Sequence, residues 1–184
     1  MLDKVISLRP YPPLSIQYAG GEPTVHKDFL EAVRMAKDKG VLDVQAASNG
    51  LLFAQKPEFA QQAAEAGLDV VYLQFDGMRD EVYEHSRGRP LFEKKMQAIE
   101  NLKQVGIMVT LVPTIVRGLN DDQIGEILQF AVKNTDAVTA ISFQPVSITG
   151  RIDQSKRLEM RYTMADMARD LQEQTGILDM YRDW

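Results

Sequence analysis

The sequence predicts an α/β fold in which parallel strands form a curved sheet, a partial barrel, with helices on its outer side. Between residues 14 and 143, short apolar segments alternate with helical segments, which is the pattern of successive βα units. Within the strands apolar residues alternate with polar ones, so one face of each strand is polar. Strands of a doubly wound sheet are covered on both faces and tend to be apolar throughout. A flavodoxin-like doubly wound sheet is therefore the less favoured alternative.

The strands and helices are expected in alternation. The strands are predicted at residues 14–19, 43–48, 69–75, 107–115 and 138–143, and the helices at residues 27–39, 57–66, 92–105, 121–133 and 163–175. Each strand has period-two alternation, as in Val71, Leu73 and Phe75 against Tyr72 and Gln74. The first three helices are each followed by a glycine, the residue that favours a helix stop. Thr163 is a suitable N-cap for the last helix, and residues 151–158 are polar and predict a loop.

Composition excludes several classes of protein. With 184 residues, 45% of them hydrophobic and 26% charged, the chain fits one globular domain. Its apolar runs are shorter than the roughly 20 residues of a membrane span and its start is unlike a signal peptide, so we expect a cytoplasmic protein with no transmembrane segment. A net charge of -5 with scattered basic residues argues against a nucleic-acid partner. The chain has no cysteine and hence no thiolate for an iron-sulfur cluster or a disulfide.

Polar residues and glycines stand at every predicted strand end. In parallel α/β proteins these carboxyl ends are where ligands bind. The strand ends comprise residues 20–22, 48–50, 74–77, 114–118 and 144–145. Gly20 and Gly21 allow close approach of the backbone to a ligand, and the Glu22 carboxylate suits an ammonium group. Taken alone, the turn is equally well interpreted as an ordinary strand-to-helix connection with Glu22 near the helix start.

The order of these strand ends carries a resemblance. The turn Gly20-Gly21-Glu22-Pro23, followed by Asn49 and Asp76 on the next strand ends, resembles the S-adenosylmethionine-binding turn of radical SAM enzymes. Longer segments resemble the radical SAM subgroup that contains tetraether lipid synthases and relatives linked to methanopterin methylation. These segments are residues 72–77, 111–121, 143–151 and 161–163. The resemblance covers most of the chain, from about residue 14 to residue 184.

The resemblance implies a cofactor-binding role for particular residues. They are Gly20, Gly21, Glu22, Asn49, Gln74, Asp76, Thr114, Arg117 and Gln144. Gly20, Gly21 and Glu22 are expected at the methionyl amine, and Gln74 or Asp76 at the ribose. Asn49 is expected to line the methionyl end. The backbone around Ile115 and Val116, and around Gln144 and Pro145, is expected to flank the adenine. Arg117 is expected to pair with the cofactor carboxylate, while no catalytic residue and no metal ligand is assigned.

The resemblance also implies a domain organisation. In the family, a six-stranded, TIM-like (β/α)6 partial barrel carries a 4Fe-4S cluster on a loop with three cysteines after its first strand. By analogy, residues 14–19 are the second strand, and we expect the first strand and the cluster loop to be missing from this chain. Residues 1–150 are expected to form the core barrel and residues 151–184 a truncated, helical C-terminal extension.

Three interpretations of function follow. In the first, the chain is part of a radical SAM transferase and is inactive alone. The whole enzyme would cleave S-adenosylmethionine reductively for carbon-carbon bond formation or methylation on a lipid or pterin-like substrate. The second is a cluster-free, non-catalytic α/β ligand-binding module or an inactive truncated product. The third is a small enzyme of another chemistry, which the lack of an acid, base and nucleophile set makes the least favoured. The loop 87–90 is expected to be solvated, and Met160, Met164 and Met167 to be core residues.

Overall fold

The computed structural model describes residues 2–8, 10, 11, 13–147 and 154–183. The described chain divides into two compact units. The first unit comprises residues 1–74 and 94–110, and the second comprises residues 75–93 and 111–184. Five strands, β1 (Ser15–Tyr18), β2 (Asp43–Ser48), β3 (Val70–Gln74), β4 (Met108–Val112) and β6 (Val138–Ile141), form one sheet in that order. Strands β5 (Thr114–Ile115) and β7 (Gln144–Pro145) form a separate pair. This is the predicted α/β class with parallel strands.

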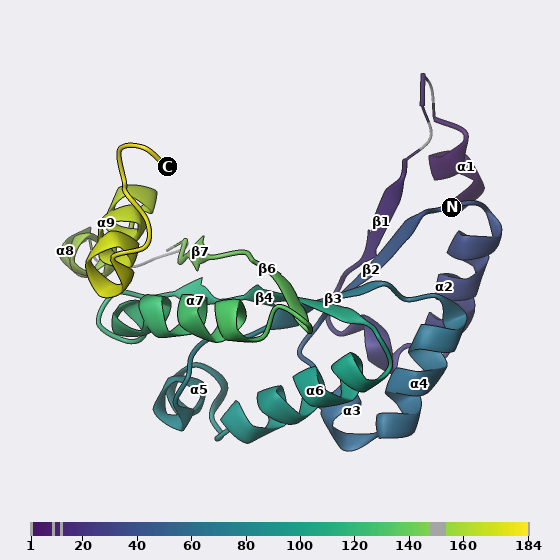
Figure 1. The fold of residues 1–184 in the computed structure, drawn as a ribbon, viewed down its shortest axis with the longest axis horizontal. Helices are drawn as coiled ribbons and strands as arrows, with labels where there is room; N and C mark the ends of the chain where they lie inside the picture. The colour runs from purple at the N-terminus through teal and green to yellow at the C-terminus, as the bar shows by residue number, and fades with distance from the viewer. Residues whose placement is uncertain (1, 9, 12, 148–153, 184) are drawn as a thin grey trace. The chain divides into compact units, whose positions relative to one another are not determined.

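The first unit is built on three parallel strands, β1 (Ser15–Tyr18), β2 (Asp43–Ser48) and β3 (Val70–Gln74). Tyr18 pairs with Ala46, and Ser48 pairs with Leu73. The helices of this unit are α1 (Leu2–Ile6), α2 (Phe29–Asp38), α3 (Leu51–Gln55), α4 (Pro57–Ala66) and most of α6 (Phe92–Gln104). Helices α2 and α4 lie side by side (Figure 1). This register brings the carboxyl ends of the three strands to one edge of the sheet.

The core of the first unit explains the alternation in its strands. In β2, Val44 and Ala46 are fully buried, whereas Gln45 and Ala47 are half-buried. Three phenylalanines from the helical side are in contact: Phe29 and Phe59 are stacked with ring centroids 6.2 Å apart, and the Phe53 ring is tilted against Phe59 at 5.2 Å. Because the apolar face of β2 is buried in this core, the predicted polar face is left for the other side of the sheet.

The second unit contains shorter strands and five helical segments within its described residues. Its elements are α5 (Asp80–Arg87), the end of β4 (Met108–Val112), β5 (Thr114–Ile115), the 3-10 helix η2 (Asp121–Gln123), α7 (Ile124–Lys133), β6 (Val138–Ile141), β7 (Gln144–Pro145), α8 (Gln154–Met160) and α9 (Met164–Thr175). Helices α7 and α9 pack together (Figure 1). Their apolar faces enclose a core of Ile115, Ile124, Tyr162, Met167 and Leu171.

The structure corrects some of the predicted boundaries. The strand expected at residues 107–115 is divided at Pro113 into β4 and β5, because proline has no N–H to continue a strand ladder. Part of the loop expected at residues 151–158 is helix α8, which begins at Gln154; residues 151–153 lie outside the described chain. Helices α3 and α5 were not expected. Of the three methionines, Met167 is a core residue but Met160 and Met164 are exposed. No helix within the described ranges combines the length and the apolar character that a membrane span needs.

Candidate functional site

The Glu22 carboxylate is held at the strand edge of the first unit. Thr24 Oγ1 and Ser48 Oγ donate to Glu22 Oε1 over 2.6 and 2.9 Å, and the Thr24 N–H does so over 3.3 Å. The Asn49 N–H donates to Glu22 Oε2 over 2.7 Å. A carboxylate oxygen can accept about two hydrogen bonds, so Oε2 retains room for one more donor. Among the described residues no cation pairs with Glu22, and the donors that contact it are hydroxyls and backbone N–H groups, all neutral.

The glycines before Glu22 leave the edge open. Gly20 has a φ of +149°, and a Cβ added at Gly20 or Gly21 would meet no atom within 4 Å. Two glycines therefore expose the backbone of the turn to a ligand. Glu22 itself is the N-cap of the 3-10 helix η1 (Pro23–Val25), and its side chain accepts from the Thr24 N–H. The turn is thus also the ordinary strand-to-helix connection that the sequence allowed, since one side chain serves both purposes.

The turn after β2 supports the same edge. Gly50 has a φ of +79°, and a Cβ there would lie 2.4 Å from Leu73 Cδ1 and 3.3 Å from Ala98 Cβ, so only glycine fits. Lys95, which is 1% exposed, donates from Nζ to the Asn49 carbonyl over 2.6 Å. These contacts hold the backbone of Asn49, whose N–H donates to Glu22. Gln74 follows the paired residue Leu73, just as Asn49 follows Ser48, so Gln74 stands at the same edge.

In the second unit, Asp76 is the centre of a buried network. Asp76 is 2% exposed, and its Oδ2 accepts from Arg87 Nε and Nη2 over 3.0 and 2.8 Å. Its Oδ1 accepts from the Thr114 N–H over 3.3 Å. Residues 87–90 are exposed, as expected for a solvated loop, but the Arg87 guanidinium also pairs with the buried carboxylate of Asp76. A cavity of about 90 Å³ is lined in part by Asp76, Arg87, Thr114 and Asn120.

Asn120 joins the strand ends of this network. It is fully buried, and its Nδ2 donates to the carbonyls of Asp76 and Thr114 over 2.6 and 2.8 Å. Its Oδ1 accepts from the Val116 N–H over 2.7 Å. Gln144 pairs with Thr114 between β7 and β5, so these two expected site residues are neighbours. Sequence reasoning did not single out Asn120, because an asparagine before two aspartates is also typical of a helix start.

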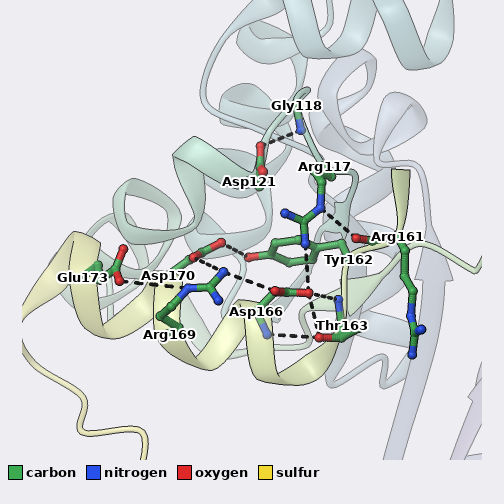
Figure 2. Close-up of polar contacts among 10 residues, drawn as sticks. All are labelled: Arg117, Gly118, Asp121, Arg161, Tyr162, Thr163, Asp166, Arg169, Asp170 and Glu173. Atoms are coloured by element: carbon green, nitrogen blue, oxygen red, sulfur yellow. Dashed lines mark hydrogen bonds and ion pairs between the residues drawn. The ribbon is translucent and has the colours of Figure 1, made fainter. Parts of the chain in front are cut away.

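Arg117 is engaged within the protein. Its Nη2 pairs with Asp166 Oδ2 over 2.9 Å, its Nε donates to the Arg161 carbonyl over 2.7 Å, and its guanidinium lies 5.6 Å from the centre of the Tyr162 ring. Figure 2 shows this arrangement. The Thr163 hydroxyl and N–H, and then Arg117, lower the pKa of Asp166 to about 2. Burial, reinforced by its hydrogen bond to Asp170, raises the pKa of Tyr162. The contacts of Arg117 thus tie the segment after β5 to the start of α9.

The donor set determines which cofactors the chain can hold. A 4Fe-4S cluster needs thiolates, and the sequence has no cysteine. In the described parts of the chain, no group of three or more histidines and carboxylates is arranged to bind a metal ion. These residues do not fit a cluster. Glu22 Oε2, which has room for one more donor, and the exposed turn at Gly20 and Gly21 do fit an ammonium-bearing ligand.

The family is shown by sequence similarity. The model of the radical SAM superfamily matches residues 2–131, and the chain belongs to that superfamily. It is 46% identical over 165 residues to the 7,8-dihydro-6-hydroxymethylpterin dimethyltransferase of Methanocaldococcus jannaschii, covering 89% of this chain and 32% of that protein. It is 33% identical over 129 residues to a probable GTP 3',8-cyclase of Thermococcus kodakarensis, covering 70% of this chain and 41% of the cyclase. The chain thus spans less than half the length of either relative.

Solved structures share the fold. The protein is similar to SuiB of Streptococcus suis, solved with bound S-adenosylmethionine, with a TM-score of 0.65, 18% identity and coverage of 86% of this chain and 33% of SuiB. It is also similar to a domain of the pyruvate-formate lyase-activating enzyme from Bacteroides vulgatus, with a TM-score of 0.59, 13% identity and coverage of 86% of this chain and 93% of that domain. The predicted family and fold class are therefore confirmed, while the cofactor roles of individual residues stay predictions.

Proposed function

We propose that this chain supplies an S-adenosylmethionine-binding turn of a radical SAM protein that transfers a methyl group to a pterin-like substrate. The single observation that supports the binding role is the geometry of the Glu22 carboxylate. Ser48 and Asn49 fix it at the strand edge, and Oε2 has room for one more donor. In the whole protein, reductive cleavage of bound S-adenosylmethionine would supply the radical for this transfer. The protein's own part is to pair Glu22 with the ammonium of the methionyl group and to present the Gly20-Gly21 backbone to it.

The pterin-like substrate is proposed from the 46%-identical relative, whose name specifies a dihydropterin. The identity extends over 165 residues, whereas the similarity to the cyclase covers 129. Direct binding of 7,8-dihydro-6-hydroxymethylpterin and of GTP, measured by calorimetry, separates the two substrate classes. We expect the pterin to bind more tightly; tighter binding of GTP would overturn this part of the proposal and favour a cyclase-like substrate.

The cofactor proposal is tested by Glu22→Gln. Glutamine keeps the length of the side chain and can still accept from the Asn49 N–H, but it lacks the charge that attracts an ammonium. A charge-assisted hydrogen bond contributes about 1.5–3 kcal/mol, so we expect the dissociation constant for S-adenosylmethionine to rise roughly 10- to 150-fold. Titration calorimetry measures this effect.

Glu58→Gln is the matched control, because Glu58 is an exposed glutamate in the first turn of α4. The control variant should bind like the original protein. A thermal melt of each variant separates lost binding from lost structure. Unchanged affinity in Glu22→Gln, with the control also unchanged, would show that the ammonium is bound elsewhere and that the site assignment is wrong.

A further inference from the structure

The second unit contains a cavity that shares no residue with the expected cofactor site. It has a volume of about 350 Å³ and is lined by Val146, Ser147, Arg157, Leu158, Arg161 and Tyr162. Arg157 belongs to the last turn of α8, and Arg161 follows the end of that helix. The Arg161 N–H reaches back to the Leu158 carbonyl over 3.4 Å, which continues the turn. Residues four apart lie on one side of a helical turn, so both arginines border the same cavity.

In the described part of the chain, no acidic side chain offsets the charge of these two guanidinium groups. Arg157 and Arg161 are exposed, and neither side chain has an ion-pair partner among the residues that the structure describes. Figure 2 shows the contact from Arg117 to the backbone carbonyl of Arg161. Arg117 and Arg169, by contrast, both pair with Asp166. Two like charges side by side repel each other, and a bound anion would relieve that repulsion.

The wall of the cavity is well supported. Tyr162 is 4% exposed, belongs to the hydrophobic core, and donates from its hydroxyl to Asp170 Oδ2 over 2.8 Å. Arg117 Nε fixes the Arg161 carbonyl over 2.7 Å. On the other side, the Val146 N–H donates to the Ile115 carbonyl over 2.8 Å and so anchors the backbone next to Ser147. The backbone that carries Arg161 and Ser147 is therefore held in place before any ligand arrives.

We propose that this cavity binds the phosphate or diphosphate group of a phosphorylated small molecule. Guanidinium groups offer planar pairs of donors that match phosphate oxygens, and the Ser147 hydroxyl adds a neutral donor. Two positive charges balance the double negative charge of a phosphate monoester. The volume exceeds that of a bare ion, which leaves space for part of the molecule that bears the phosphate. This proposal goes beyond S-adenosylmethionine binding and does not depend on Glu22.

The test uses inorganic pyrophosphate as the probe, with Arg157→Gln and Arg161→Gln as the variants. Glutamine keeps part of the apolar stem and removes the charge. We expect saturable binding of one pyrophosphate per chain, weakened about tenfold or more by either substitution, because each removes one charge-assisted contact. Arg34→Gln is the control, since Arg34 is an exposed arginine on α2 of the first unit. It should bind pyrophosphate like the original protein.

Citrate at the same ionic strength provides the second arm, because near neutral pH its three carboxylates carry a charge close to that of pyrophosphate. Weaker binding of citrate than of pyrophosphate supports the phosphate assignment, and equal or tighter binding would overturn it in favour of a carboxylate site. Amide shifts on titration should map to Ser147, Leu158 and Tyr162. Absence of saturable binding, or equal loss in Arg34→Gln, would overturn the site. Because S-adenosylmethionine binding is measured separately through Glu22, failure here leaves the proposed function standing.

Discussion

Asn120 shows how one buried side chain sets the geometry of several strand ends. Its amide satisfies the carbonyls of Asp76 and Thr114 and the N–H of Val116; Asp76 is buried, and Thr114 and Val116 are half-buried. Leaving a buried polar group without a partner costs about 1–3 kcal/mol. The side chain therefore acts as an internal brace for the residues that line the small cavity around Asp76.

We predict that Asn120→Ala lowers the free energy of unfolding by about 3 kcal/mol, because three backbone groups lose their partner at once. Chemical denaturation measures the change. Asn134→Ala is the control: the Asn134 side chain donates to the Phe130 carbonyl, at the half-buried end of α7, where water can replace it. The control should lose less than about 1 kcal/mol. Equal effects of the two substitutions would contradict the bracing role of Asn120.

Glu22 and Asp76 differ in how they match the sequence prediction. Glu22 stands in a local motif, and its contacts to Thr24, Ser48 and Asn49 leave one acceptor position open, as a ligand-binding carboxylate needs. Asp76 was expected at the ribose, but its Oδ2 is occupied by both donors of Arg87. Only Oδ1, which accepts from the Thr114 N–H, has a position left for a hydroxyl. The ribose role of Asp76 stays a prediction.

At the scale of elements, α9 has the best-defined start. Thr163 was predicted as its N-cap, and the structure confirms it. The Thr163 side chain accepts from the Asp166 N–H, and Asp166 Oδ2 accepts from the Thr163 N–H over 2.9 Å and from its hydroxyl over 2.7 Å, a complete capping box. Helix α8 lacked such a signal. Its residues are largely polar, so no apolar periodicity distinguished it from a loop.

We predict that the capping box makes the stability of α9 depend on pH in the acid range. The folded pKa of Asp166, about 2, lies below the ordinary value of 3.8. The stabilisation is therefore present above about pH 4 and is lost as the pH falls through about 2. Melts between pH 5 and pH 2 should show this loss.

Thr163→Ala should raise the pKa of Asp166 toward its ordinary value, because the Thr163 hydroxyl is the largest cause of the shift. The substitution should cost about 1 kcal/mol of stability. Carboxyl-carbon NMR titration measures the pKa. Thr175→Ala, at the other end of α9, where the hydroxyl donates to the Leu171 carbonyl, should leave the Asp166 pKa unchanged. A pKa that is unaffected by Thr163→Ala would refute this assignment of cause.

At the scale of the whole molecule, the cofactor that the family implies does not fit the residues of this chain. The superfamily implies an iron-sulfur cluster, but this sequence has no cysteine. We predict that anaerobic reconstitution with iron and sulfide yields no stoichiometric cluster, since thiolates are the ligands such clusters need. Iron analysis and the thiolate-to-iron absorption measure it, with a cysteine-ligated ferredoxin treated in parallel. Stoichiometric iron with that absorption would prove the prediction wrong.

The domain organisation is also a question at this scale. We propose, by analogy with the family, that residues 1–150 correspond to the core barrel and residues 151–184 to a C-terminal extension. The two compact units of the structure divide the chain differently, because each unit takes residues from separate stretches of the sequence. Tyr162, Met167 and Leu171 belong to the core around Ile115, so part of the proposed extension is integral to the second unit.

The sequence by itself determined the α/β class, most strand and helix positions, the Gly20-Gly21-Glu22 turn and the family. These features depend on residues close together in the chain, namely the periods of strands and helices and the chemistry of turns. Only the tertiary structure decided that Asp76 pairs with Arg87, that Asn120 braces the strand ends, and that Arg117 faces Asp166. It also decided that Arg157 and Arg161 border one cavity. Several opposite charges were available to each arginine in the sequence. Which one it meets depends on which distant segments the folded backbone brings within hydrogen-bond reach.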